Sequence, residues 1–471
     1  MPFNQSVQTL PANSSSLKPA STQFWLLAIF LVIVSLMGGA SRVDVQSLVL
    51  LRPLTMIFCA LAFLTLRREH LSGRKLLLTG FIAISLLCFL HLIPLPPALW
   101  QSLPGREILV EVDRLAGLDD MWRPLTMTPM NGWHALASLT VPLTVILLGI
   151  QLNRDDLCRL LPVLLAIGAA SGLLGMLQVM GDPRGWLYLY SVTNNGTAVG
   201  LFANRNHAAT LLACLFPMLA VYASLNTGNV DRQRLQQFAA IAMGTVLVPL
   251  VLVTGSRSGM LLALLGLGAA ILLYRKPVQG GIARRSGAAF KLEAWHLVAV
   301  GMVASLVLLT IFFSRAESID RLFDRSAAED TRSGYWQLGI AMVWKYFPFG
   351  SGFGSFVEVF QIDEPSRLLK PTYVNHMHND WLEIVLTGGV PAALLLIGAI
   401  ATYMVGATRL WRNKELDSRA VKIARLAAVL IGLLAMASIT DYPLRTPSLM
   451  ALFAVLCLWF TAPAVPRNKA E

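Results

Sequence analysis

Long apolar stretches constrain this chain more than any other feature. Hydrophobic residues make up 55% of its 471 residues, and charged residues only 14%. A helix needs about 20 mostly apolar residues to cross a bilayer. About twelve stretches approach that length, near 24–40, 47–66, 76–93, 134–152, 159–180, 207–225, 236–254, 258–274, 295–313, 382–404, 422–440 and 446–462. They are uniformly apolar rather than alternating, which indicates helices and not barrel strands. The sequence therefore predicts an all-α polytopic integral membrane protein.

The basic residues indicate how this protein is oriented in the membrane. The net charge is +12, and the Lys and Arg clusters fall in alternate gaps between the stretches, near 67–75, 232–234, 275–291 and 409–425. Basic loops stay on the cytoplasmic side. One topology places all four clusters and both termini there, so the charge is an orientation signal rather than a nucleic-acid site.

This topology divides the chain into five parts. Residues 1–23 form a disordered cytoplasmic tail, 24–313 hold spans one to nine, and 381–462 hold spans ten to twelve before a short tail at 463–471. The segment 314–380 becomes a long periplasmic loop. Loops of that length are usually functional or carry their own secondary structure. We expect a short helix from Tyr335 to Lys345, with Trp336 and Trp344 as interfacial anchors.

The segment His-Met-His-Asn-Asp at 376–380 joins this loop to the next apolar stretch. Ionisable groups at such a boundary suggest a functional site. Three interpretations fit: zinc ligation together with His207, a general base, or a cap for the following helix by Asn379 or Asp380. Capping is compatible with either chemical role.

Two arginines lie in segments that also face outward. Arg257 stands in Thr-Gly-Ser-Arg-Ser-Gly at 254–259, between two apolar stretches, and Arg332 precedes the predicted loop helix. Guanidinium groups bind phosphate in a bidentate manner. A snorkelling arginine in a tight turn and a solvated loop arginine are the structural alternatives.

Two further segments are ambiguous. Asn204-Arg-Asn-His207 begins span six, where its amides suit sugar hydroxyls, diphosphate oxygens or helix capping. The segment 348–356 has alternating glycines, but no strand–helix unit surrounds it. A backbone turn packed on the membrane domain therefore fits better than a phosphate-binding loop.

Taken in order, these segments resemble the O-antigen ligase and polymerase superfamily. The matching features are Arg123-Pro-Leu-Thr, 200–206, 254–259, Arg332 before Trp336, Pro348 with its glycines, His378-Asn-Asp-Trp-Leu, and Gly388-Gly-Val-Pro. The resemblance implies a GT-C-like membrane glycosyltransferase that moves a glycan from a polyprenyl-diphosphate carrier to an acceptor at the periplasmic face of the bacterial inner membrane. The resemblance further implies an inverting transfer that is independent of metal and needs no cofactor.

The resemblance also assigns roles to residues. Arg257 and Arg332 hold the diphosphate, and His378 activates the acceptor hydroxyl, although this chain also has His376 as a candidate base. We assign further residues to substrate binding: Asn204, Asn206, His207, His376, Asn379 and Trp336. The acceptor separates a ligase acting on lipid A-core, a polymerase of repeat units and a protein O-oligosaccharyltransferase, and the sequence favours the first two. A transporter or flippase of lipid-linked glycans and a scaffold protein are the alternatives from other classes.

Overall fold

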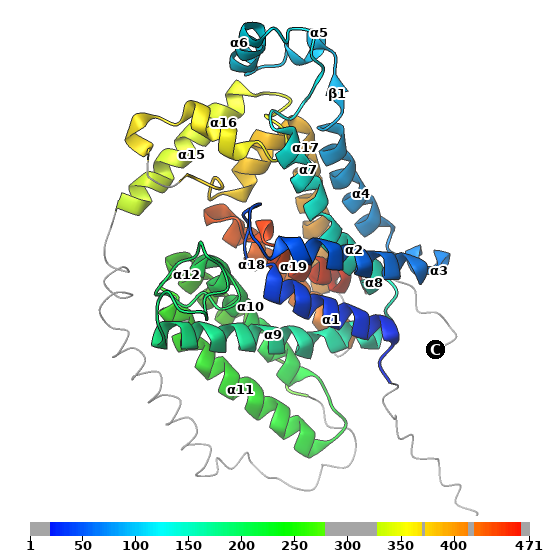
Figure 1. The fold of residues 1–471 in the computed structure, drawn as a ribbon. Helices are drawn as coiled ribbons and strands as arrows, with labels where there is room; N and C mark the ends of the chain where they lie inside the picture. Colours follow the sequence, from blue (N-terminus) through cyan, green and yellow to red (C-terminus); the bar gives the residue numbers. More distant parts are fainter. Residues whose placement is uncertain (1–18, 278–326, 370–372, 413–418, 463–471) are drawn as a thin grey trace, which may run out of the picture.

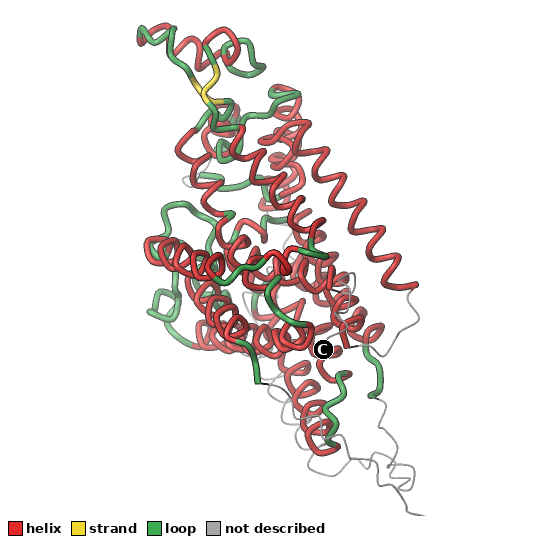
Figure 2. Tube along the Cα trace, turned by 90° about the vertical axis from the view of Figure 1, so that its right-hand side faces the viewer, coloured by secondary structure: helices red, strands yellow, loops and turns green. Residues whose placement is uncertain are grey.

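The computed structural model describes residues 19–277, 327–369, 373–412 and 419–462. Within these ranges the protein is all-helical apart from one short antiparallel pair, β1 (Pro94–Leu95) and β2 (Arg123–Pro124). This confirms the all-α part of the predicted fold class. The strand pair joins a small appendage, α5 (Pro97–Trp100) and α6 (Glu107–Ala116), to one end of an elongated helical body (Figures 1 and 2).

Eleven of the predicted spans coincide with apolar helices or helix pairs in the described residues. Six are long and apolar enough to cross a membrane: the pair α7 (Pro129–Ser138) and α8 (Thr140–Gly149), α9 (Arg154–Met180), α10 (Arg205–Ser224), α11 (Val230–Val253), α17 (Asp380–Arg412) and α18 (Arg419–Thr440). Five are shorter: α1 (Thr22–Met37), α2 (Leu48–Leu64), α4 (Lys75–Leu90), α12 (Arg257–Leu273) and α19 (Pro447–Thr461). The predicted span 295–313 lies outside the described residues, as do most of the tail 1–23 and residues 463–471. The total of about twelve spans stays a prediction.

Polar residues set where several of these helices begin. The side chains of Asn153, Asn204, Asn229 and Ser256 each accept a hydrogen bond from a backbone amide in the first turn of α9, α10, α11 and α12, respectively. Such caps satisfy amides that have no partner within the helix. Capping by Asn204, one of the predicted alternatives, is therefore confirmed.

Helix α10 is the centre of the larger hydrophobic core, which also includes residues of α1, α8, α9, α18 and α19. In its apolar window 89% is buried, whereas in α17 only 28% is buried. A helix that is apolar on all sides belongs in the interior of a bundle. Helix α10 is thus enclosed by other parts of the protein along most of its length.

The long loop forms a second, smaller core with the start of α17. The helices α15 (Ala327–Lys345) and α16 (Phe356–Asp363) and the 3₁₀ helix η2 (Ser366–Leu368) supply most of it. The predicted helix that ends at Lys345 is confirmed, but it begins at Ala327 rather than Tyr335, so Arg332 lies within the helix and does not precede it. Trp344 is 70% exposed. Residues 314–326 and 370–372 of the loop lie outside the described residues.

The alternating glycines form a turn packed against the helices, as predicted. A Cβ at Gly352 would lie 2.1 Å from Thr126 Cα, and one at Gly350 would lie 2.6 Å from Thr387 O. Both glycines have positive φ. The amides of Ser351 and Gly352 donate to Leu386 O and Thr387 O. Because the turn's amides bond to carbonyl groups, this segment does not form a phosphate cradle.

The helix ends meet on two opposite sides of the body. On one side Ser448 N donates to Gly38 O, and Ala203 N donates to Gly39 O. On the other, Arg74 Nη1 donates to Leu458 O and Lys422 Nζ donates to Ser224 O. The described residues Gly38, Ala203 and Ser448 thus share one side, and the basic residues Arg74, Arg275 and Lys422 lie at the opposite helix ends. Which compartment each side faces stays a prediction.

Candidate active site

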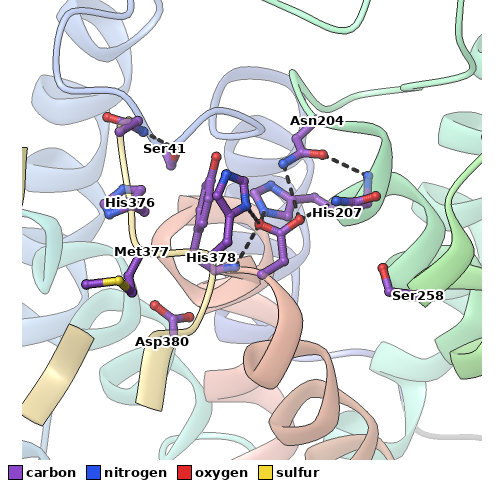
Figure 3. A network of polar contacts seen from close by, with 12 residues as sticks. Ser41, Asn204, His207, Ser258, His376, Met377, His378 and Asp380 are labelled. Carbon is purple, nitrogen blue, oxygen red and sulfur yellow. Dashed lines mark hydrogen bonds and ion pairs between the residues drawn. The ribbon is translucent and has the colours of Figure 1, made fainter. Parts of the chain in front are cut away.

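A buried aspartate, Asp441, connects the predicted site residues from two distant parts of the chain. It directly follows α18 and precedes Tyr442, after which the 3₁₀ helix η3 (Pro443–Arg445) begins. Its carboxylate accepts from Asn206 Nδ2 at 2.6 Å and Asn204 Nδ2 at 3.4 Å, and it lies 3.2 Å from His378 Nδ1. Figure 3 shows His378, His207 and Asn204 converging on this point. The fold therefore brings 204–207 and 376–380 to one carboxylate.

The surroundings of Asp441 favour its ionised form. Burial alone would raise the pKa of the carboxyl group, but the side chains of His207 and His378 outweigh burial and hold that pKa well below its usual value of 3.8. His207 Nε2 lies 3.8 Å from Asp441 Oδ1, and the backbone amide of Tyr442 donates to the same oxygen at 3.0 Å. A carboxylate in this position orients a neighbouring imidazole and stabilises its protonated form.

His378 has an unusual backbone conformation. With φ at 54°, it is the only non-glycine residue in the described part of the chain with positive φ. For an ordinary L-residue the left-handed region costs about 1–2 kcal/mol. Such strain persists only where the surroundings impose it and is common at functional sites. Its neighbours do so here: Met377 is fully buried, and Asn379 Oδ1 accepts from Leu382 N at 3.1 Å as the cap of α17.

A second set of charges holds the residues before His378. Glu383, from the first turn of α17, bonds to His376 Nδ1 at 2.9 Å and accepts from Met377 N at 2.9 Å. Arg445 donates to Asp380 at 2.8 Å and lies 3.4 Å from Glu383. Burial would lower the pKa of Arg445, but the carboxylates of Glu383 and Asp380 raise it above its usual value. These ion pairs fix the path of the chain into His378.

Tyr442 separates the histidines. Its ring centroid lies 4.6 Å from that of His376, 5.0 Å from that of His378 and 5.1 Å from that of His207. One aromatic ring therefore limits the movement of three imidazoles. Tyr442 directly follows Asp441, so the same turn supplies both the carboxylate and the ring that packs against the histidines.

The segment that holds Arg257 is tied to the same network. Ser256 caps α12 by accepting from Gly259 N at 3.0 Å, and its hydroxyl donates to Asn206 Oδ1 at 2.8 Å. Gly255 allows the sharp entry into the helix with φ at 61°. Arg257 is the first residue of α12, and its side chain is half-buried. Asn206 thus bridges the helix start at Arg257 and the carboxylate of Asp441.

Comparison with known proteins identifies the central part of this arrangement. Residues 238–397 match the family model described as O-antigen ligase. The chain carries an O-antigen ligase domain. This match supports the O-antigen ligase and polymerase superfamily that the sequence motifs predicted. No curated protein matches the chain.

The matched part of the O-antigen ligase domain includes Arg257, Arg332 and His378, but not Asn206 or Asp441. Helices outside the matched segment therefore complete the surroundings of His378. Helix α10 contributes Asn206, and the turn after α18 contributes Asp441.

Helix α15 of the ligase domain carries Arg332, whose side chain lies outside the described residues. The helix packs closely on the residue before His378. A Cβ at Gly339 would lie 2.6 Å from Met377 Cε. Trp336, also on α15, is half-buried, and its Nε1 has no hydrogen-bond partner among the described residues. The fold thus brings the helix of Arg332 against the His378 segment.

Four residues of this site were not predicted: Asp441, Tyr442, Arg445 and Glu383. The sequence indicated only a short turn at 441–445, and Glu383 was placed within an apolar stretch. A charged residue in a tight outer turn was the available signal. It does not reveal a partner that is 63 residues away.

The zinc interpretation of His376, His378 and His207 finds no support in the geometry. No group of three or more His, Cys, Asp or Glu side chains in the described ranges is arranged to hold a metal ion. Metal independence itself stays a prediction.

Proposed function

We propose that this protein is a membrane glycosyltransferase that moves a glycan from a polyprenyl-diphosphate carrier to an acceptor sugar, as an O-antigen ligase or surface-polysaccharide polymerase. The observation that carries the proposal is the contact between His378 and the buried Asp441, within a chain that holds an O-antigen ligase domain. We place this reaction at the periplasmic face of the bacterial inner membrane, with both termini in the cytoplasm.

His378 acts as the general base. The carboxylate of Asp441 bonds to Nδ1 of His378, which leaves Nε2 of His378 to accept the proton of the acceptor hydroxyl. The acceptor oxygen then bonds to the anomeric carbon, while the bond from that carbon to the diphosphate oxygen breaks and its electron pair leaves with the diphosphate. Attack from the face opposite the leaving group inverts the anomeric centre. The charge of Asp441 stabilises the imidazolium that forms.

Arg257 and Arg332 hold the leaving diphosphate. Arg257 begins α12, and the amides of a helix N-terminus attract anions as well. Cations placed before the reaction stabilise the charge that develops on the leaving oxygen. Arg257→Lys should lower turnover severely, because an ammonium group cannot replace a bidentate guanidinium. Turnover equal to that of the unmodified protein would remove Arg257 from the site.

The residues predicted to bind substrate divide into two groups. Asn204, Asn206 and His207 surround Asp441, which supports a positioning role for their side chains. His376 and Asn379 contact Glu383 and the start of α17. Direct contact of these five residues, or of Trp336, with a sugar stays a prediction.

An apolar pocket supports a lipid-linked donor. It lies between α1, α9, α10 and α19, and Phe202 in its wall packs edge-on against His207. A polyprenyl chain needs such a surface beside its diphosphate. Leu211→Trp should fill this space and raise KM for the lipid-linked donor while leaving the acceptor KM unchanged.

The decisive experiment measures release of free polyprenyl diphosphate by the purified protein. A lipid-linked glycan and candidate acceptors are supplied with and without chelator, beside the His378→Asn variant. Release that requires acceptor and His378 and persists in chelator would establish the metal-independent transferase, and the active acceptor would identify the subtype. Donor binding without release for every acceptor would overturn the proposal in favour of a transporter or flippase.

A further inference from the structure

Ser256 caps α12, and its hydroxyl also reaches a second helix. Its Oγ accepts from Gly259 N at 3.0 Å, and the hydroxyl donates to Asn206 Oδ1 at 2.8 Å. Both side chains are buried, with 1% of Ser256 and 8% of Asn206 exposed. A hydroxyl has a single proton to donate, and here that proton is committed to Asn206. The start of α12 therefore fixes how the amide of Asn206 is turned.

The donors in this network all point towards Asp441. Because the amide oxygen of Asn206 accepts from Ser256, its Nδ2 faces the carboxylate and donates to Asp441 Oδ2 at 2.6 Å. A reversed amide would place its oxygen against a carboxylate oxygen, and neither atom carries a proton to share. The hydrogen bonds therefore run from the first turn of α12 to the carboxylate that contacts His378.

The two oxygens of Asp441 have different partners. Oδ1 lies 3.2 Å from His378 Nδ1 and accepts from Tyr442 N, whereas Oδ2 accepts from Asn206. A donor on one oxygen stabilises the negative charge of the carboxylate, so the imidazole at the other oxygen gains less from becoming protonated. Hydrogen bonds in series polarise one another, so the bond from Ser256 strengthens the donation by Asn206. Both residues thus make the imidazole easier to deprotonate.

We propose that Ser256 and Asn206 are positioning residues that, through the carboxylate, set how strongly His378 holds a proton; this rests on its proposed role as the general base. A base works best when its proton affinity matches the working pH. A buried carboxylate without donors would hold the proton on the imidazole too strongly for that. Because Arg257 is the first residue of α12, one hydrogen-bonded unit joins the diphosphate-binding helix to the base.

Other ionisable groups surround this network in the described part of the chain. They are His207 on α10, Arg257 on α12, His376, Asp380 and Glu383 around the start of α17, and Tyr442 and Arg445 after α18. None of them changes when Ser256 or Asn206 is replaced. A shift between such variants therefore reports on the two neutral donors and not on a lost charge.

The test follows protonation of His378 in the full chain and needs no turnover. Diethyl pyrocarbonate modifies the neutral imidazole, and tandem mass spectrometry assigns the adduct to His378. The pH of half-maximal modification should rise by about one unit in Asn206→Leu, a tenfold change in proton affinity, because leucine has a similar size but no donor. Ser256→Ala should raise it by less, since it acts through Asn206. Asp441→Asn should lower it.

Two controls separate this role from a structural one. Ser256→Thr keeps the hydroxyl and should keep the midpoint of the unmodified protein. Asn229→Ala removes the cap of α11, where Asn229 accepts from Arg232 N, and should also leave the midpoint unchanged. Equal shifts in Ser256→Ala and either control would overturn the proposal. If Asn206→Leu does not fold, Ser256→Ala decides, and an unchanged midpoint there contradicts the proposal.

Release of polyprenyl diphosphate by the same variants keeps this inference distinct from the proposed function. The acid limb of the pH–rate profile should move to higher pH together with the midpoint of modification. Shifted midpoints in a protein that releases no polyprenyl diphosphate would support the network and remove the reaction. Normal release with unshifted midpoints would support the reaction and remove the network.

Discussion

Two histidine–carboxylate pairs lie side by side in this protein, and they differ in how far the imidazole of each is exposed. His376 contacts Glu383, and His378 contacts Asp441. The side chain of His376 is 15% exposed, and its Nε2 is buried with no partner among the described residues. The side chain of His378 is 25% exposed. The first imidazole is enclosed in protein, whereas the second can meet a substrate.

The carboxylates differ as well. Glu383 lies beside the cation of Arg445, so its charge is compensated within the protein. Asp441 is held by the amides of Asn204 and Asn206, which are neutral donors. Its negative charge therefore remains available to a protonated imidazole. The comparison favours His378 as the base. It indicates that the His376–Glu383 pair holds the chain segment before His378 in place.

The largest effect is expected from His378→Asn. Asparagine tolerates the left-handed backbone at φ 54°, so this change removes the base with little disturbance of the turn. Loss of a general base lowers turnover by about 100- to 10,000-fold. Single-turnover release of polyprenyl diphosphate measures the effect, and turnover within a few fold of the unmodified protein would exclude His378 as the base.

Asp441→Asn should have the second-largest effect. Turnover should fall about 100-fold, because the imidazolium of His378 loses its counter-charge. The pKa of Asp441 is lowered in the folded protein, so its stabilising contribution is present above its unfolded pKa and is lost only as pH falls through the folded value. Asp441 itself therefore does not titrate near neutral pH.

The acid limb of the pH–rate profile should move to lower pH in the Asp441→Asn variant. An unchanged acid limb would contradict the pairing of His378 with Asp441.

Glu383→Gln should affect stability more than chemistry. It removes one charge from the ion pairs that hold Met377 and His376, at a cost of about 1.5–3 kcal/mol in the free energy of unfolding. Arg445 keeps Asp380 as a partner, so the fold should survive. Thermal unfolding and kcat are measured on the same preparation. A drop in kcat as large as that of Asp441→Asn, without a change in Tm, would reverse the roles of the two pairs.

The smallest effect is expected from His376→Gln. The glutamine amide can still donate to Glu383, and the lost imidazole has no free access to substrate. Turnover should stay within about threefold of the unmodified protein, far less than the loss of a general base. A loss comparable to that of His378→Asn would show that the base had been assigned to the wrong histidine.

The local parts of this architecture could be read from the sequence. Apolar length predicted the helices, and turn chemistry predicted the cap at Asn379 and the glycine turn at 348–356. Each depends on residues that are near one another in the chain. The ordered motifs also predicted the O-antigen ligase domain.

The partners of these motifs could not be read in the same way. Asp441 reaches His378 from 63 residues away, and Asn206 reaches Asp441 from 235 residues away. Such contacts depend on which helix ends meet, and apolar periodicity does not encode that pairing.

By itself the sequence determined the helical membrane character of this chain and its O-antigen ligase domain, because apolar length and motifs are properties of residues that are close together in the chain. Only the tertiary structure decided that His378 rather than His376 has the open position. The two imidazoles are two residues apart and chemically identical. Their difference arises from the left-handed turn at His378 and from the carboxylates that packing brings to each, since burial and charge at a side chain are properties of its surroundings and not of its own residue type.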